Sequence, residues 1–346
     1  MGTVMSGIAL TGLGGPEMLE WRDDLPRPEA GPGDVLIKVA AAGVNNTDIN
    51  TRIGWYSQSG DASSDAAWTG KPLEFPRIQG ADICGVITAV GADVNTARIG
   101  QRVIVEPCFQ EYDGKILEAP WYIGSECDGG FAQYVRVASR HAFEVNCDLS
   151  DVELASFPCS YSTAENMLTR ANVQAGETVL VTGASGGVGS AAVQLAQARD
   201  AHVIAVTSET KFELLRDLGA GQTVARDADL VAELGASCVD VVVDLVGGPS
   251  WPSLLTVLRP GGRYAVAGAI AGHQLALDAR TLYLKDLSLF GCTVLSPGVF
   301  ARLVGRIEAG EIEPLVAETF PLKDIVKAQD SFQLKGHVGK IVLLVD

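Results

Sequence analysis

The sequence predicts an α/β protein in which a doubly wound parallel sheet is inserted into a β-rich domain. Up to about residue 155 the chain has short apolar runs separated by glycine and proline, whereas strands and helices alternate from residue 156. A last apolar run, at residues 338–345, is expected to rejoin the first domain. We therefore expect residues 1–155 and 298–346 to form one domain and residues 156–297 the other.

The β-rich region is expected to contain antiparallel strands. Its strand-like runs are residues 35–39, 83–90, 102–105 and 132–137. Frequent glycine and proline between these runs favour tight turns and antiparallel pairing. Residues 56–68 are expected to form a surface loop and, together with residues 112–121, to shape a substrate pocket.

The second region alternates between the two kinds of element. Strands are expected at residues 179–181, 203–206, 223–224, 239–246, 263–267 and 287–294, and helices at residues 187–199, 211–218, 251–258 and 299–309. Such alternation predicts a parallel sheet with helices on both faces. Sheets of this kind bind ligands beyond the carboxyl ends of the strands, where the strand order reverses.

A glycine-rich turn joins the first of these strands to its helix. It comprises Ala184, Ser185, Gly186, Gly187, Val188 and Gly189, with alanine at the first glycine position of the usual motif. Strand, glycine turn and helix together are typical of dinucleotide binding. Gly186 leaves room for a pyrophosphate, Gly189 lets the helix pack closely on the sheet, and the helix N-terminus favours negative charge. The alternative is a turn that only connects the two elements.

Composition limits the partners and the compartment. The 42 acidic and 26 basic residues give a net charge of −16, which argues against nucleic acid and anionic membranes as partners. No apolar run approaches the roughly 18 residues of a membrane span, and the N-terminus has no signal-peptide pattern. Seven scattered cysteines without a C-x-x-C pair are typical of reduced thiols, so we expect a cytoplasmic protein.

Several ordered motifs carry a family resemblance. They are Gly43-Val-Asn-Asn-Thr-Asp, Gly80-Ala-Asp-Ile-Cys-Gly, Gly100-Gln-Arg-Val, Asp128-Gly-Gly-Phe-Ala-Gln, the glycine turn and Leu258-Arg-Pro-Gly-Gly-Arg. Over nearly its whole length the chain resembles the medium-chain dehydrogenase/reductase superfamily, and within it the zinc-free quinone oxidoreductase branch. The resemblance implies a Rossmann dinucleotide-binding domain inserted in a GroES-like catalytic domain.

The same resemblance implies that the chain lacks a catalytic zinc. Zinc alcohol dehydrogenases of the superfamily use a cysteine, a histidine and a later cysteine, and the matching positions here are Asn45, Ala81 and Cys159. A catalytic zinc needs three protein ligands. Asp82 could reach a metal, yet one thiolate and one carboxylate make a poor zinc site. We interpret Cys159 as a small buried residue.

The end of the second strand of the parallel sheet favours NADPH over NADH. An NAD enzyme places an acidic residue there, which binds the ribose and repels a 2′-phosphate. Here Thr207 leaves room for the phosphate, Ser208 can donate to it, and Lys211 follows one helical turn later. Two observations oppose this interpretation. Glu209 lies nearby, and Ser208 and Lys211 could be only a helix cap and a solvated residue.

Other cofactor contacts follow from the resemblance alone. Thr163 stands where the superfamily contacts the nicotinamide. The loops containing Val246 and the pair Gly268 and Ala269 should flank the ring at the ends of two strands. Lys340 is expected either to reach the cofactor phosphates or to be an exposed lysine at a strand edge.

Without zinc, hydrogen-bond donors must polarise the hydride acceptor, which favours an acceptor that is already electrophilic. The candidate donors are Asn45, Tyr56 and Arg52. In the resembled branch a tyrosine often occupies the position of Asn50. Tyr56 could instead pack over the mouth of the pocket, and Arg52 could lie at the surface or at a domain interface.

We therefore expect an NADPH-dependent, zinc-independent oxidoreductase whose partner is a small-molecule quinone or α,β-unsaturated carbonyl. The alternatives are a zinc-type alcohol dehydrogenase with a degenerate metal site and a dinucleotide-binding redox sensor with little catalysis. The apolar run at residues 287–294 would be an exposed edge of the parallel sheet, so we also expect a homodimer formed through that strand.

Overall fold

The computed structural model describes residues 3–346, which form two compact units. One contains the chain up to Cys159 together with Pro314–Asp346, and the other contains Ser160–Glu313. The sequence placed the boundaries at 155/156 and 297/298. The second unit extends further because α10 (Val299–Glu308) is bound to it, through ion pairs from Arg302 and Arg306 to the buried Glu165.

The second unit is built on a six-stranded parallel sheet, which confirms the predicted α/β fold class. Its order is β12 (Gln222–Ala225), β11 (His202–Thr207), β10 (Thr178–Val181), β13 (Val239–Asp244), β14 (Leu258–Val266) and β15 (Ser288–Gly291). The order reverses between β10 and β13, so a ligand is expected at the carboxyl ends of these two strands.

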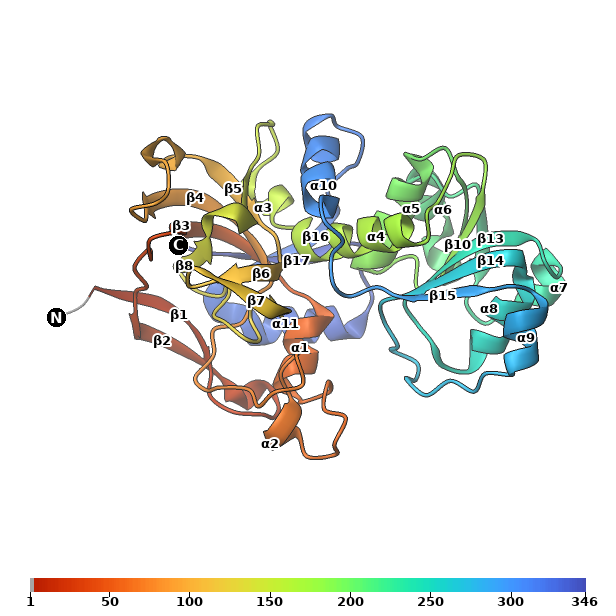
Figure 1. Ribbon diagram of the computed structural model, residues 1–346, viewed down its shortest axis with the longest axis horizontal. Helices are drawn as coiled ribbons and strands as arrows, with labels where there is room; N and C mark the ends of the chain where they lie inside the picture. The colour runs from red at the N-terminus through yellow and green to blue at the C-terminus, as the bar shows by residue number, and fades with distance from the viewer. Residues whose placement is uncertain (1–2) are drawn as a thin grey trace. The chain divides into compact units, whose positions relative to one another are not determined.

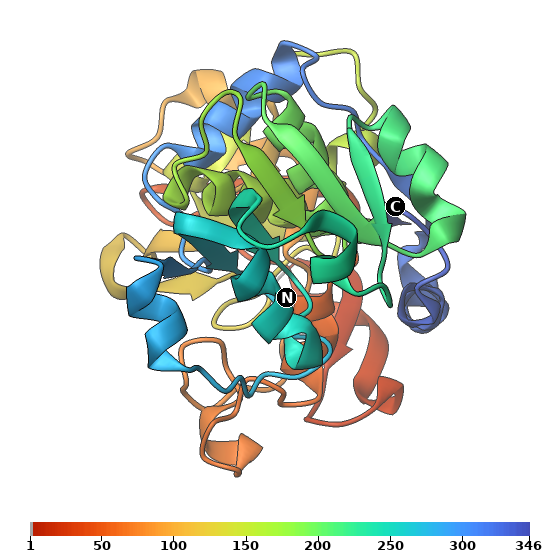
Figure 2. The ribbon, with the colours of Figure 1, turned by 90° about the vertical axis from the view of Figure 1, so that its right-hand side faces the viewer.

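Helices cover both faces of this sheet (Figures 1 and 2). The helices of this unit are α4 (Pro158–Arg170, which begins in the first unit), α5 (Gly187–Gln197), α6 (Phe212–Asp217), α7 (Leu230–Leu234), α8 (Trp251–Val257), α9 (Ala279–Leu284) and α10, which pairs with α4. In Figure 1, α5 and α6 lie on one side of the strands and α8 and α9 on the other. The central strands are therefore buried on both faces, which explains their nearly continuous valine and leucine.

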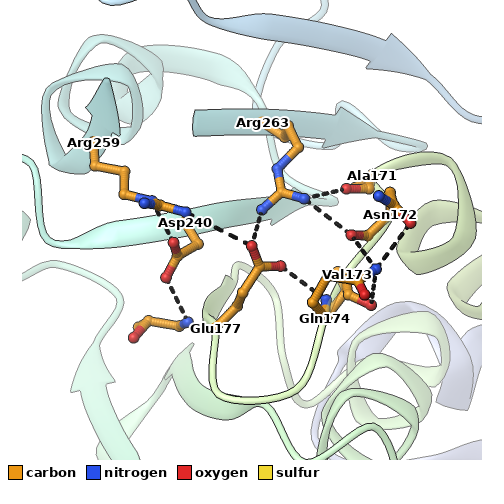
Figure 3. A network of polar contacts seen from close by, with 9 residues as sticks. Ala171, Asn172, Val173, Gln174, Glu177, Asp240, Arg259 and Arg263 are labelled. Atoms are coloured by element: carbon orange, nitrogen blue, oxygen red, sulfur yellow. Dashed lines mark hydrogen bonds and ion pairs between the residues drawn. The ribbon is translucent and has the colours of Figure 1, made fainter. Parts of the chain in front are cut away.

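An ion-pair network secures the amino ends of β10, β13 and β14 (Figure 3). Glu177 accepts a hydrogen bond from Arg263 at 2.5 Å, and Asp240 pairs with Arg259. Asp240 also accepts from the Thr178 backbone N–H at 2.7 Å. The network ties three parallel strands together at the edge opposite their carboxyl ends.

The first unit contains a sheet that the closing strand joins. Its order is β16 (Val316–Pro321), β17 (Lys340–Leu344), β3 (Asp34–Gly43), β4 (Asp82–Val90), β5 (Arg102–Val105) and β9 (Ala142–Glu144), with β8 (Tyr134–Ala138) also paired to β3. β17 pairs with β3 in antiparallel fashion, so the expectation that the last run rejoins the first domain is confirmed.

Smaller elements complete this unit. They are the strands β1 (Val4–Leu10), β2 (Leu19–Pro26), β6 (Cys108–Tyr112) and β7 (Lys115–Tyr122), and the helices α1 (Asn46–Arg52), α2 (Ala62–Asp65), α3 (Asp151–Leu154) and α11 (Ile325–Leu334).

Two irregular stretches of the sequence have regular structure. Residues 56–68 include α2, and residues 112–121 belong to the β6–β7 hairpin. Asp113 and Gly114, at the tip of the hairpin, have φ of 52° and 69°, which is the hairpin turn that Asp-Gly favours. The sequence therefore contained a signal for this hairpin that its polar composition obscured. No helix within residues 3–346 is long and apolar enough to cross a membrane.

Candidate cofactor site and active site

The glycine turn leads directly into α5, as predicted. Gly183 has φ of +57°, and Gly186 caps the helix without a side chain. A Cβ at Gly186 would come no closer than 3.5 Å to the rest of the protein, so the space over it is open to a ligand. A Cβ at Gly189 would lie 2.3 Å from the Gly183 carbonyl oxygen. Gly189 therefore packs the helix against the turn itself, not against the sheet.

Two cationic residues, Lys211 and Arg226, follow the carboxyl ends of β11 and β12. Thr207 is buried at the end of β11, and the half-buried Lys211 ends the 3₁₀ turn that follows it. The backbone N–H of Arg226 donates to the Thr207 carbonyl at 2.9 Å. Burial and the charge of Arg226 lower the pKa of Lys211.

Sequence reasoning missed Arg226 because it follows a weak strand. The parallel register pairs Thr207 with Ala225, so the residue after Ala225 stands beside the end of β11. Ser208 begins the 3₁₀ turn, but its hydroxyl does not cap it and instead contacts Thr210 Oγ1 at 3.4 Å. Ser208 is therefore the N-cap residue of this turn, as the alternative expects, although its side chain makes no capping hydrogen bond.

The remaining cofactor candidates of the second unit lie on α4 and on two loops. Thr163 is half-buried on α4. Val246 follows β13, and its carbonyl accepts from the Ala271 N–H at 2.9 Å in the loop after β14. A Cβ at Gly268 would lie 2.8 Å from the Leu245 carbonyl oxygen. Hence the loops that contain Val246, Gly268 and Ala269 pack against each other at the carboxyl edge of the sheet.

Lys340 lies in the first unit and is buried there, with 2% of its surface exposed. Its Nζ pairs with Asp82 Oδ2 at 2.7 Å and donates to the Val44 carbonyl at 3.0 Å and to Asn45 Oδ1. An ammonium has three N–H groups, and all three have acceptors here. Both expectations for Lys340, an exposed edge lysine and a phosphate ligand, are therefore replaced by a buried ion pair.

Asn45 is part of the same cluster. Its Nδ2 donates to Asp82 Oδ2 at 2.9 Å and to the Gly43 carbonyl at 3.4 Å, while its Oδ1 accepts from Lys340. The amide therefore orients a buried carboxylate and an ammonium. As placed, it has no N–H left for an acceptor molecule.

Arg52 lies at the other end of α1, roughly 10 Å along the helix axis from Asn45. It is buried, and its guanidinium donates to the Gly14 carbonyl at 2.9 Å and to Gln329 Oε1 at 3.1 Å. These bonds connect the loop after β1, α1 and α11. The structure thus does not bring Arg52 together with Asn45, and it excludes a surface position.

Tyr56 has polar partners at the start of α1. Its hydroxyl donates to Thr47 Oγ1 at 3.1 Å and also bonds to the Asn50 side chain. Burial raises the pKa of Tyr56, so the phenol keeps its proton at neutral pH. Thr47, which sequence reasoning missed, immediately follows the Asn45-Asn46 pair, and this closeness to a candidate donor was the available signal.

The residues at the expected zinc position do not fit a catalytic zinc. Ala81 has no donor atom, and Asp82 is paired with the Lys340 ammonium. Cys159 Sγ lies 2.9 Å from Tyr122 Oη; burial, with the nearby charge of Asp82, raises the pKa of Cys159 to about 12. Across residues 3–346 no group of three or more His, Cys, Asp and Glu side chains is placed to hold a metal ion.

Comparisons with known proteins agree with both halves of this architecture. Residues 31–146 match the family model of the alcohol dehydrogenase GroES-like domain, and residues 187–309 match that of zinc-binding dehydrogenases. A quinone oxidoreductase of Lama guanicoe is 30% identical, over 99% of this chain and 98% of its own. The chain belongs to the medium-chain dehydrogenase/reductase superfamily.

Other members of the superfamily are similar in sequence or structure. A solved structure from Sinorhizobium meliloti 1021, provisionally assigned as an alcohol dehydrogenase, is 47% identical with a TM-score of 0.93, covering 100% of this chain and 98% of that one. An NAD-dependent alcohol dehydrogenase of Sulfurisphaera tokodaii is 29% identical, over 98% of this chain and 100% of its own. These relatives support oxidoreductase activity and nicotinamide dinucleotide binding.

The match to zinc-binding dehydrogenases does not bear on the metal positions. It covers residues 187–309, whereas Asn45, Ala81 and Cys159 all lie before residue 187. The matched range begins within the glycine turn, at Gly187, and contains the strands β11 to β15 of the parallel sheet.

Asp48 adds a titratable group to the cluster around Asn45. It is buried in α1, and its Oδ2 accepts from the Asn45 backbone N–H at 2.7 Å. Burial raises the pKa of Asp48 to about 7. Because the folded-state pKa lies above the unfolded value, the fold is more stable when Asp48 is protonated. This contribution to the free energy of unfolding is complete at low pH and is lost as the pH rises through about 7.

Replacing Asp48 by asparagine should remove this loss. Relative to the wild type, we expect Asp48→Asn to gain on the order of 2 kcal/mol of unfolding free energy between pH 5 and pH 8, measured by denaturant titration. The matched control is Asp93→Asn, an exposed position. A difference between Asp48→Asn and the wild type that is constant with pH would contradict the assignment.

Proposed function

We propose that this medium-chain dehydrogenase/reductase is an NADPH-dependent, zinc-independent reductase that transfers hydride to a quinone or an α,β-unsaturated carbonyl. The observation that carries the proposal is the buried cluster of Lys340, Asp82 and Asn45 at the position where a zinc enzyme of the superfamily holds its metal. The ammonium pairs with Asp82, Asp48 accepts from the Asn45 backbone N–H, and burial keeps the Cys159 thiol protonated by raising its pKa to about 12, so no anionic ligand set remains to attract a dication.

Because the proposed reaction uses no metal ion as a Lewis acid, it favours a hydride acceptor that is already electrophilic. The reduced nicotinamide supplies the hydride, and the protein supplies position and hydrogen bonds. Removing a proton from an unactivated alcohol without a metal is difficult, whereas a quinone or enone is already electrophilic. We propose that the Tyr56 hydroxyl, which donates to Thr47 Oγ1 in this structure, turns its single O–H to the oxygen on which negative charge develops and then accepts a hydrogen bond from the Thr47 hydroxyl.

The preference for NADPH is supported by charge at the ends of β11 and β12. Thr207 has no carboxylate to repel a 2′-phosphate, and Lys211 and Arg226 are close enough for the charge of one to affect the pKa of the other. The relative from Sulfurisphaera tokodaii is an NAD-dependent alcohol dehydrogenase, so binding of NADPH and of NADH is compared directly.

Removing the two cations should weaken NADPH selectively. We expect Lys211→Ala and Arg226→Ala each to raise the dissociation constant of NADPH about tenfold, because each loses a charge-assisted contact to the 2′-phosphate. The constant for NADH should stay within about twofold in the same titrations. Arg216→Ala is the control, since that exposed side chain bonds to Thr223. A wild type that binds NADH more tightly would show the cofactor assignment to be wrong.

The reaction itself is tested with a panel of quinones, enones and alcohols after dialysis against a chelator. We expect turnover of quinones or enones without bound zinc, and Tyr56→Phe should lower kcat about 10²-fold with little change in the NADPH dissociation constant. Tyr283→Phe, at an exposed tyrosine, is the control. Stoichiometric zinc that is lost together with activity would favour the degenerate alcohol dehydrogenase. NADPH binding without any turnover would favour a redox sensor.

We also propose a homodimer formed through β15. This strand ends the parallel sheet, and Leu289 on it is 40% exposed. The neighbouring helix α9 exposes Tyr283 and Leu284. An unpaired apolar edge of this kind favours pairing with a second copy about a twofold axis.

The mass in solution tests this arrangement. We expect the wild type to have twice the mass of one chain by light scattering, and Leu289→Arg to be a monomer because it places a charge at the centre of the interface. Leu214→Arg, at a position of equal exposure on α6, should remain dimeric. A monomeric wild type would refute the proposed dimer.

A further inference from the structure

Asp244 is a fully buried carboxylate at the carboxyl end of β13, with 0% of its surface exposed. Its Oδ1 accepts from Thr182 Oγ1 at 2.5 Å and from the backbone N–H of Val246 at 2.9 Å. The Gly247 N–H, at 3.2 Å from Oδ1 and 3.3 Å from Oδ2, and the Tyr264 hydroxyl complete its partners. The carboxylate is thus held by donors from three strands or their following loops.

None of these partners is a cation. Across the described chain, residues 3–346, Asp244 makes no ion pair with lysine, arginine or histidine. Burying a carboxylate among neutral donors is unfavourable unless each lone pair is used. At the other end of the same sheet, by contrast, the half-buried carboxylates Asp240 and Glu177 are each paired with an arginine (Figure 3). We therefore interpret Asp244 as a residue that fixes the positions of the groups that donate to it.

Those donors include the start of the loop after β13. The N–H groups of residues 245–247 all bond to Asp244 or to Thr182, and the Gly248 N–H bonds to the Gly272 carbonyl at 3.1 Å. Gly247 has φ of +63°, and a Cβ there would lie 2.7 Å from the Gly272 carbonyl oxygen. Because its N–H groups are used inside the protein, this loop cannot bind an anion with them.

The same carboxylate is connected to the glycine turn. Thr182 immediately precedes Gly183, and its hydroxyl both donates to Asp244 and accepts from the Leu245 N–H at 3.0 Å. A Cβ at Gly183 would lie 3.1 Å from Val246 Cγ2, so the turn and the loop are in contact. The pair formed by Thr182 and Asp244 thus sets the separation between the turn and Val246.

We propose that Asp244, acting through Thr182 and Tyr264, is a positioning residue that holds the nicotinamide-side loops at a fixed distance from the phosphate-binding turn. Val246 and the loop with Gly268 and Ala269 then bear on the nicotinamide while the glycine turn holds the pyrophosphate. The inference rests on the dinucleotide binding in the proposed function. It is independent of the acceptor and of the choice between NADPH and NADH.

A comparison of binding between the whole cofactor and its adenine half distinguishes this positioning role from a general structural one. We compare the dissociation constant of the preferred reduced cofactor with that of its adenine fragment, 2′,5′-ADP for NADPH or ADP for NADH. Asp244→Asn replaces one acceptor oxygen by a donor, so we expect about tenfold weaker binding of the whole cofactor and less than about twofold change for the fragment. The emission of the bound reduced nicotinamide should also shift toward that of free cofactor.

A second pair of variants keeps the test decisive if Asp244→Asn does not fold. Thr182→Val should reproduce the selective loss, and Thr182→Ser, which keeps the hydroxyl, should bind both ligands like the wild type. Glu177→Gln weakens the distant network of Figure 3 and should lower thermal stability without altering either dissociation constant.

Parallel weakening of cofactor and fragment, or unchanged binding in both Asp244→Asn and Thr182→Val, would overturn the positioning role alone. A wild type that binds neither NADPH nor NADH would instead overturn the proposed function. The wild-type arm therefore separates the two failures.

Discussion

The first unit depends on the buried ion pair between Lys340 and Asp82. Lys340 begins the last strand of the chain, and Asp82 begins β4, so one interaction connects segments far apart in sequence. Removing either partner would leave an uncompensated charge in a dry environment, which is far more costly than losing a surface pair. Asn45, Val44 and the Cys159 N–H use the remaining hydrogen-bonding capacity of the pair. The start of α1 and the start of α4 are thereby tied to one charged centre.

The second unit follows a different constraint, the convergence of parallel strands. Each strand of the sheet ends at the same edge, so residues far apart in sequence meet there without any mutual local signal. Glycines at Gly183 and Gly247 allow positive φ where the loops turn sharply. Arginine–carboxylate ion pairs connect the strands at the amino edge of this sheet, whereas neutral donors surround Asp244 at the carboxyl edge.

Local patterns in the sequence predicted much of this architecture. The alternation of strands and helices, the glycine turn and the return of the closing strand depend on hydrophobic periodicity and backbone freedom, which are visible in short windows. The contacts between residues far apart in the sequence could not be predicted from such windows. Arg226 required the register between β11 and β12, and the burial of Lys340 required knowing that β17 lies beside β3. Arg52 and Asn45 belong to one helix, but their distances along it and their burial decide that they do not act together.

The contrast between Asp82 and Asp244 bears on the chemistry. Asp82 pairs with the Lys340 ammonium inside the protein. Its negative charge is therefore neutralised within the fold, and little negative potential remains to attract a metal dication. Asp244 faces only hydroxyl and amide donors, whose positions it determines through hydrogen-bond direction. Under the proposed zinc-independent function, hydrogen-bond donors rather than a metal ion polarise the acceptor. Such a scaffold suits the reduction of an acceptor whose own electrophilicity lowers the barrier, because accurate placement of the hydride donor is then the main contribution required of the protein.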